Sequence, residues 1–278
     1  MSEYKGKSLD FSVIVNKILG ECVNNLQSIN ALTFLNNQLW EFGKTSNELP
    51  ELNIPLMFSN RNLYQDKTPL EIIGNDFTRY NINHAIIITF TAIEDYLVKI
   101  NAVHNVIDKA EINNYISTQN EFKRIYSESI NNRYFSWEKV LKPKIPYQFD
   151  DSKQIDLYKS FETLKSMRNC IVHRFGTIKE LDIEEDKDFE VYWLNHKIFA
   201  GDKEIEVTPF INNTDKYLPF SIRQDIETKS FKRGEKININ LKEYNDISLT
   251  LLNFCNHVAK ISLEILKERI DKKRHNSN

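Results

Sequence analysis

The chain has 278 residues, of which 41% are hydrophobic and 12% aromatic, so it can form a packed core and is not a disordered protein. Its formal net charge of -2 gives no overall basic field, and contact with RNA or DNA would depend on local basic patches. The sequence shows no signal-peptide pattern and no apolar run long enough to span a membrane. We therefore expect a cytoplasmic protein without a membrane partner.

The first half of the chain predicts long helices. Residues 10 to 42 carry apolar side chains at three- and four-residue spacing after Asp10, a candidate N-cap, and predict one long helix or two. An irregular connection with three prolines follows over residues 45 to 75. A second helix is predicted from about Asp76 to past Ile100. Its segment AIIITF is apolar on nearly every side, which is typical of a helix deep in a bundle.

Residues 104 to 149 predict a helical excursion that ends in a mixed basic and aromatic segment, NNRYFSWEKVLKPKIPY. A surface loop whose aromatic side chains dock on the core is the more ordinary interpretation. The alternative is a nucleic-acid face that combines charge with base stacking. Its candidate RNA-binding side chains are Arg133, Lys139, Lys142 and Lys144.

A third helix is predicted from Asp150 or Asp151, both good N-caps, to the glycine at 176. One of its faces carries an apolar stripe at helical spacing, formed by Leu157, Phe161, Leu164, Ile171 and Phe175.

The remaining segments predict a β insertion at about residues 186 to 240 and a final helix. A hairpin is expected from residues 189 to 194 and 203 to 208, and KININL is a candidate for a further strand. The final helix is predicted over about residues 241 to 272. The expected fold is therefore mainly α, a helical bundle with a small β-hairpin or sheet insertion before the C-terminal helix.

A polar constellation interrupts the stripe of the third helix. Arg168 falls in the middle of the stripe, and a buried guanidinium needs a carboxylate, another strong acceptor or a water-filled cleft. Glu94 on the second helix is the best carboxylate for this role. His173 is rotated by about 140° from Arg168 on an ideal helix, whereas Asn169 and His173 are one turn apart. Arg168 and His173 would converge only through a distorted last turn or a groove between two copies of the chain.

The stretch from Arg168 through Asn169 to His173 resembles the R-x(4-6)-H signature of the HEPN superfamily of ribonucleases. Glu94 fits the acidic position that these helical bundles carry on an earlier helix, and Arg174, directly after the histidine, also resembles many members. The resemblance implies a single HEPN-like domain over residues 1–278, with the segments 104–149 and 186–240 as elaborations. It further implies a homodimer that assembles one active site from two motifs.

The activity implied by the resemblance is metal-independent RNA cleavage in toxin-antitoxin, abortive-infection or other anti-phage systems. His173 would act as base on the ribose 2'-hydroxyl or as acid toward the leaving 5'-oxygen. Arg168 would bind the scissile phosphate, Asn169 would position the phosphate or the imidazole, and Glu94 would hold the arginine. The expected partners are transfer, messenger or ribosomal RNA, a second copy of the chain, and an antitoxin or other regulatory protein.

Ordinary structural explanations compete with these expectations. Arg168 and His173 would also suit a structural helix end in a catalytically inactive HEPN-like binding or regulatory subunit. The remaining histidines lack metal-ligand spacing, and the acidic segment 183–190 is more typical of a solvated loop. Three well-separated cysteines in apolar segments favour reduced thiols. We expect no metal and no cofactor, and the motifs of nucleotide-binding loops and serine hydrolases are missing.

Overall fold

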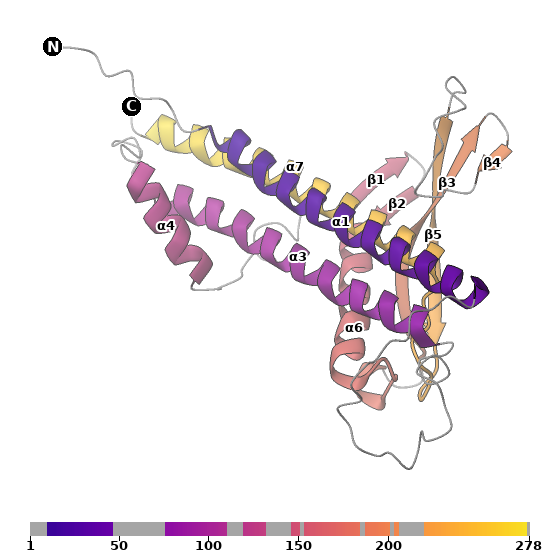
Figure 1. Ribbon diagram of the computed structural model, residues 1–278. Coiled ribbons are helices and arrows are strands. Elements are labelled where there is room, and N and C mark those ends of the chain that lie inside the picture. Colours follow the sequence, from indigo (N-terminus) through magenta and orange to yellow (C-terminus); the bar gives the residue numbers. More distant parts are fainter. Residues whose placement is uncertain are drawn as a thin grey trace, which may run out of the picture. The chain divides into compact units, whose positions relative to one another are not determined.

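The structure is a computed structural model that describes residues 10–46, 76–109, 119–131, 146–150, 153–183, 187–200, 203–205 and 220–276. The helices are α1 (Phe11–Ser46), α3 (Phe77–Lys109), α4 (Gln119–Asn131), α6 (Leu157–Arg174) and α7 (Leu241–Asn276), with a 3₁₀ turn η4 at Glu180–Asp182 (Figure 1). The strands are β1 (Pro146–Asp150), β2 (Lys153–Asp156), β3 (Phe189–Ala200), β4 (Lys203–Ile205) and β5 (Phe220–Phe231). The predicted mainly α fold with a small sheet before the C-terminal helix is confirmed. No described helix has an apolar run of the length needed to cross a membrane.

Two compact units divide the chain. Unit 1 consists of Met1–Leu26, Thr89–Lys165 and Leu249–Asn278, and unit 2 consists of Gln27–Ile88 and Ser166–Ser248. Because the boundaries fall inside α1, α3, α6 and α7, each of these helices contributes one part to each unit. That the whole chain is one domain stays a prediction.

Aromatic rings from three helices form the centre of unit 1. Phe161 of α6 stacks on Phe254 of α7 with ring centroids 4.4 Å apart, and Phe90 of α3 lies 5.7 Å from Phe161. All three rings are buried. Since burying a side chain of this size stabilises a fold by about 2–3 kcal/mol, these contacts hold the helices of this unit together.

Two of the cysteines meet in the same core. The Sγ atoms of Cys22 on α1 and Cys255 on α7 lie 3.9 Å apart, and both thiols are free and buried. Burial and the neighbouring Cys22 raise the pKa of the Cys255 thiol. Tyr96 of α3 donates a hydrogen bond of 2.8 Å to the backbone carbonyl of Cys255. Cys22 and Cys255 pack as reduced core side chains, in agreement with the sequence-based prediction.

A buried histidine links α3 and α7 in unit 1. His104 Nε2 lies 2.7 Å from Ser262 Oγ. Burial lowers the pKa of His104 from 6.5 to about 4, and the positive charge of Arg269 adds to the effect. Arg269 is itself held by Asp108, with Nη1 2.8 Å from one carboxylate oxygen and 2.9 Å from the other. His104 is therefore neutral near pH 7, with Ser262 as its local structural partner.

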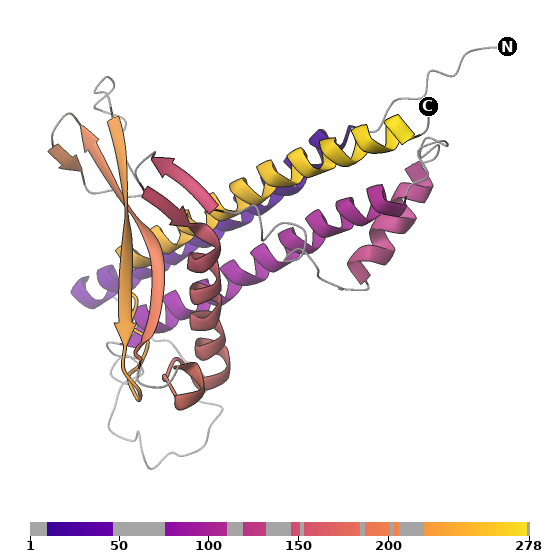
Figure 2. The same cartoon turned by 180° about the vertical axis from the view of Figure 1, so that it is seen from behind.

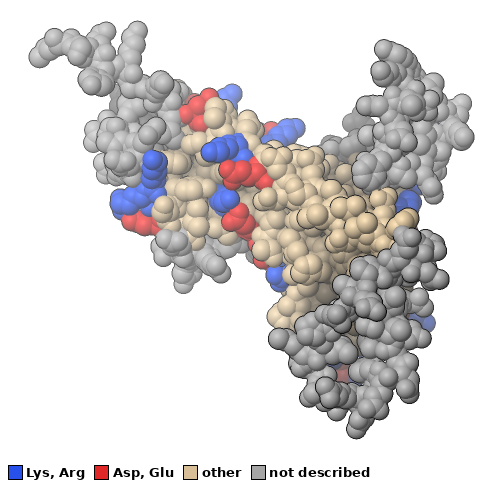
Figure 3. Space-filling model, viewed as in Figure 1, with Lys and Arg blue, Asp and Glu red and all other residues tan. Residues whose placement is uncertain are grey.

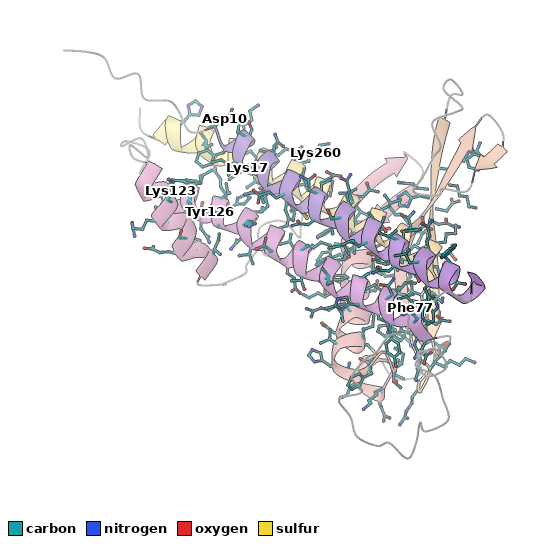
Figure 4. All side chains as sticks on the ribbon, in the orientation of Figure 1. Asp10, Lys17, Phe77, Lys123, Tyr126 and Lys260 are labelled. Carbon is teal, nitrogen blue, oxygen red and sulfur yellow. The ribbon has the colours of Figure 1, made fainter. Side chains whose placement is uncertain are left out.

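The first helix of the chain is continuous, with its predicted cap. Asp10 accepts a hydrogen bond of 2.9 Å from the backbone N–H of Ser12, which satisfies one of the free donors at the start of α1. In unit 2, Trp40 near the end of α1 packs against α3, where its ring stacks on Phe77 with centroids 4.4 Å apart. Figure 4 shows Phe77 at the beginning of α3. The two ends of the connection between these helices are thereby held close together.

An antiparallel sheet forms the β part of unit 2. Its strand order is β4-β3-β5, with β3 paired to β5 along its whole length, from Phe189↔Phe231 to Ala200↔Phe220 (Figure 2). Phe189, Val191 and Trp193 alternate along β3 and are buried, as expected for the face that packs on a core. The predicted hairpin is present in part, because β4 pairs only with Ile198–Ala200 at the end of β3, whereas residues 189–194 pair with β5. The predicted strand KININL is wrong, because the third strand is β5 and Lys236 forms only an isolated bridge.

The predicted start of the third helix is also wrong. Residues on either side of Asp151 pair as the hairpin of β1 and β2, and α6 begins only at Leu157. The cap is Asp156, whose Oδ1 accepts a hydrogen bond of 3.0 Å from the backbone N–H of Lys159. All three aspartates suit an N-cap, and strand pairing decides which one is used.

The predicted last helix is confirmed as α7, and its start is fixed by a reciprocal cap. The backbone N–H of Glu243 donates to Asn240 Oδ1 at 2.9 Å, and the backbone N–H of Asn240 donates to Glu243 Oε2 at 2.8 Å. This pattern is a capping box, which satisfies two donors at the helix start. Lys229 of β5 places its Nζ 2.9 Å from both oxygens of Glu243 and so ties the sheet to the beginning of α7.

Candidate functional site

The arginine of the motif falls within the apolar stripe of α6, at an angle about the helix axis between those of Leu164 and Phe161. Met167 and Ile171 are buried and continue the stripe, whereas Arg168 is half-buried. Its Nη1 donates a hydrogen bond of 3.0 Å to Oδ1 of the adjacent Asn169. The Nε atom of Arg168 is buried, and the expectation that the guanidinium faces the core stays a prediction. The amide of Asn169 orients a guanidinium that is still partly in contact with solvent.

The histidine of the motif lies in the last turn of α6, and its side chain is exposed. The helix continues without interruption to Arg174, so a distorted turn does not bring His173 toward Arg168. At 100° per residue, Arg168 and His173 point about 140° apart, and Asn169 and His173 point about 40° apart. His173 and Asn169 therefore share one face of an intact helix.

A turn with positive φ angles ends the helix directly after the motif. Phe175 has φ 53° and Gly176 has φ 74°. The backbone N–H of Gly176 donates to the carbonyl of Cys170 at 3.2 Å, and the N–H of Thr177 donates to the carbonyl of Arg174 at 3.0 Å. The turn directs Phe175 away from the helix, and its side chain is 90% exposed. The prediction that Phe175 extends the buried stripe is therefore wrong.

The segment after the turn is held to the helix by an ion pair. Arg174 Nη1 lies 2.5 Å from Asp182 Oδ1, and only 7% of the Asp182 side chain is exposed. Its other oxygen accepts a hydrogen bond of 2.9 Å from the backbone N–H of Lys179. The predicted RNA contact of Arg174 stays a prediction. The structure gives this side chain a second role in fixing the loop, since charge-assisted bonds of this kind are strong.

The same segment pairs with the loop between β5 and α7. The backbone N–H groups of Ile178 and Ile237 donate to the carbonyls of Glu235 and Gly176, at 2.9 Å and 2.8 Å. Arg233 forms an ion pair with Glu180, with Nη2 2.9 Å from Oε2. Two loops more than fifty residues apart in sequence thus form one ordered edge beside the end of α6.

The cysteine inside the motif is not a nucleophile. Cys170 is buried, and its Sγ donates to the backbone carbonyl of Thr177 at 3.3 Å. Burial raises the pKa of this thiol to about 11, and the negative charge of Asp182 contributes. Because a thiolate is needed for nucleophilic chemistry, Cys170 acts as a packed core side chain.

Glu94 lies on α3 within unit 1 and is half-buried, whereas Arg168 belongs to unit 2. Their pairing stays a prediction. The weak RNA-binding candidates Arg133, Lys139, Lys142 and Lys144 fall outside the described residues.

The other histidines have local environments of their own. His84 is exposed, and the buried His196 lies with Nδ1 3.4 Å from Asp246 Oδ1. Within the described ranges, no three or more histidine, cysteine or acidic side chains are close enough together to hold a metal ion.

Two features of this site were not predicted from the sequence. One is the exposed ring of Phe175, which Gly176 could have indicated, because a glycine here places the preceding residues at the end of the helix. The other is the ion pair of Arg174 with Asp182, for which the sequence offers no local signal. No family model, no curated protein and no solved structure matches this chain.

Proposed function

We propose that this chain is a metal-independent endoribonuclease of the HEPN type that acts as a bacterial toxin or anti-phage effector. The observation that carries the proposal is the arrangement at the end of α6. His173 is exposed on the same helix face as Asn169, one turn away from it, and the amide of Asn169 orients the half-buried Arg168. These are the groups that transfer of a phosphoryl group within RNA requires.

The proposed reaction breaks one phosphodiester bond without a metal or cofactor. His173 accepts the proton of the ribose 2'-hydroxyl, and the 2'-oxygen forms a bond to phosphorus. The bond from phosphorus to the 5'-oxygen breaks, and that oxygen takes up a proton. Arg168 binds the phosphate oxygens, and Asn169 orients the guanidinium. The products are a 2',3'-cyclic phosphate and a 5'-hydroxyl, and DNA resists cleavage because it lacks the nucleophile.

Helix geometry supports a site that is shared between two copies of the chain. Since α6 is undistorted up to Arg174, Arg168 and His173 of one chain diverge by about 140°. A phosphate bound by Arg168 of one copy can be reached by His173 of another when the two helices face each other across a groove. The homodimer is thus a requirement of the proposed chemistry.

The C-terminal half of α1 offers a surface for this self-association. Leu32, Leu35, Leu39 and Phe42 are between 45% and 63% exposed. At 100° per residue they fall within about 80° of one another and form a single stripe. Exposed apolar side chains arranged in this way are typical of an interface. Burying each of them fully would contribute about 1 kcal/mol.

The absence of charge around this stripe favours a second copy of the chain as its partner. No charged residue occurs from residue 22 to residue 40. After Glu21 the charged residues of α1 are Glu41 and Lys44, near its end. On the face drawn in Figure 3, Lys, Arg, Asp and Glu gather toward the first half of the helix. In a two-fold symmetric contact each side chain meets the same surface on the other copy, so a charge-free face avoids repulsion between like charges.

One observation favours the alternative, an inactive HEPN-like binding or regulatory subunit. Arg174 is engaged with Asp182 in a contact that needs no substrate, so part of the motif has a structural use. This alternative predicts that exchange of His173 changes neither RNA integrity nor growth arrest.

Cleavage of RNA by the purified protein in the presence of EDTA distinguishes the two functions. We expect the wild type to produce fragments whose 5' ends accept phosphate from a polynucleotide kinase without prior phosphatase treatment. The variant His173→Ala should lose this cleavage. His84→Ala, which removes another exposed histidine of unit 2, is the matched control and should cleave as the wild type does.

A further inference from the structure

Phe175 combines two unfavourable properties that a purely structural residue would not retain. Its φ of 53° lies in the left-handed region, where a bulky L-residue is rare and glycine is the usual choice. Its side chain is 90% exposed, so burial of the ring does not compensate for this conformation. Because strained backbone conformations cluster at active sites and ligand-binding sites, Phe175 is a candidate for contact with a ligand.

The backbone around Phe175 is fixed, which gives the ring a defined position. The preceding residue is held by the ion pair of Arg174 with Asp182. The following residue, Gly176, donates to the carbonyl of Cys170 and accepts from the N–H of Ile237. Since both neighbours are tied to the fold, the backbone of Phe175 is already ordered, and a ligand has only the side-chain rotamer to fix.

The surroundings of the ring are positively charged. The segments 174–182 and 232–236, which pair with each other, contain five basic and three acidic residues. Two of the acidic residues, Glu180 and Asp182, are engaged with arginines. No ion pair within the described ranges involves the exposed side chains of Lys179, Lys232 and Lys236. These lysines can attract a phosphate backbone.

We propose that Phe175 stacks on an unpaired base of the RNA substrate, next to the phosphate that reacts at His173. The inference rests on the proposed function, since it assigns the base-binding part of the same site. An aromatic ring in a basic setting is the usual platform for single-stranded nucleic acid. The position of Phe175, two residues after His173, limits the bound base to a nucleotide near the scissile bond.

A base fits this ring better than a protein partner does. A protein hot spot is surrounded by apolar contacts that exclude water. The one exposed large apolar side chain of the following described segment is Leu181, which is 87% exposed, and the other exposed side chains there are charged. Stacking needs only one ring face and tolerates such a setting.

Stacking also predicts how DNA behaves. Every base presents a flat face whatever the sugar, so a single-stranded DNA of the same sequence should bind at Phe175 and remain intact. It should therefore inhibit RNA cleavage competitively, and this inhibition should depend on the ring.

Fluorescence anisotropy with a labelled, unstructured RNA of roughly ten nucleotides tests the proposal. The His173→Ala background prevents cleavage during the measurement. In this background Phe175→Ala should weaken binding by about 5- to 100-fold, and Phe175→Trp should restore it. Leu181→Ala removes an equally exposed apolar side chain without a ring, and it should change the affinity by no more than about twofold.

Two results would overturn the inference. One is equal binding by the proteins with phenylalanine and alanine at position 175. The other is full restoration by Phe175→Leu, which retains apolar bulk but no ring and would indicate a protein contact instead. The experiment distinguishes this inference from the proposed function. Binding that depends on the ring, without any RNA cleavage, would refute only the nuclease proposal. Cleavage that depends on His173 and is unchanged in Phe175→Ala would refute only the stacking proposal.

Discussion

Replacing Phe175 by glycine should stabilise the fold and weaken RNA binding at the same time. The residue adopts φ 53°, which glycine adopts without a steric penalty. Because Phe175 is 90% exposed, removing its ring leaves the buried apolar surface of the protein almost unchanged. A gain in stability on loss of an aromatic side chain is unusual and follows directly from the backbone conformation.

The magnitude can be worked from this geometry. A left-handed conformation costs an ordinary L-residue about 1–2 kcal/mol, and glycine removes that cost. Glycine also has more conformational freedom in the unfolded chain, which lowers the free energy of unfolding by roughly 0.5–1 kcal/mol. The net change in the free energy of unfolding should lie between about 0 and 1.5 kcal/mol, with a centre of roughly 0.75 kcal/mol, or about 2 °C in melting temperature for a chain of this size.

Thermal and urea unfolding followed by circular dichroism would measure the change in stability. Phe175→Ala is the matched control, because alanine also loses the ring but keeps the Cβ atom and with it the strain. It should show no gain in stability. A loss of more than about 1 kcal/mol in the glycine variant would show that the ring packs on the protein, and the reasoning would be refuted.

Three further predictions concern the α1 face, the buried histidine and the loop after the motif. Leu39→Glu should convert the dimer to monomers in analytical ultracentrifugation. Val13→Glu, at a 61% exposed position earlier on α1, should leave the dimer intact. A wild-type protein that sediments as a monomer would contradict the proposed interface. His104 takes up its proton near pH 6.5 in the unfolded chain and only near pH 4 in the fold, so the free energy of unfolding should fall by roughly 3 kcal/mol as pH drops through this window. A His104→Gln variant should lack this part of the pH dependence. Identical dependence of stability on pH in the wild type and the variant would contradict the role given to His104. Asp182→Ala should lower the free energy of unfolding by about 2 kcal/mol and speed hydrogen exchange of the loop amides, because it leaves the half-buried Arg174 without its carboxylate; unchanged exchange would refute that role.

Helices with local signals were predicted well from the sequence. The N-cap at Asp10 and the beginnings of α3 and α7 agree with the structure, because caps and helical spacing act within a few residues. The placing of Arg168 and His173 on one helix also agrees with the structure.

Features that depend on distant pairing were not predicted. The strand β5 has the polar sequence FSIRQDIETKSF, without an apolar alternation, and it forms because β3 offers a complete set of backbone partners. The predicted start of α6 at Asp150 or Asp151 differs from the observed cap at Asp156, because β1 and β2 pair directly before the helix. Phe175 continues the spacing of the stripe, yet the turn at Gly176 determines its direction. The partners of Arg174 and Arg233 likewise come from the folded loops and not from spacing.

The most direct test of the central claim is cleavage by a mixed dimer. Arg168→Ala and His173→Ala should each be inactive alone. When the two variants are coexpressed, each mixed dimer contains one site with both native residues if the site is shared between copies. Random pairing then predicts recovery of about a quarter of the wild-type cleavage, with 5'-hydroxyl products. Cleavage retained by His173→Ala alone, or no recovery in the mixture, would contradict the account.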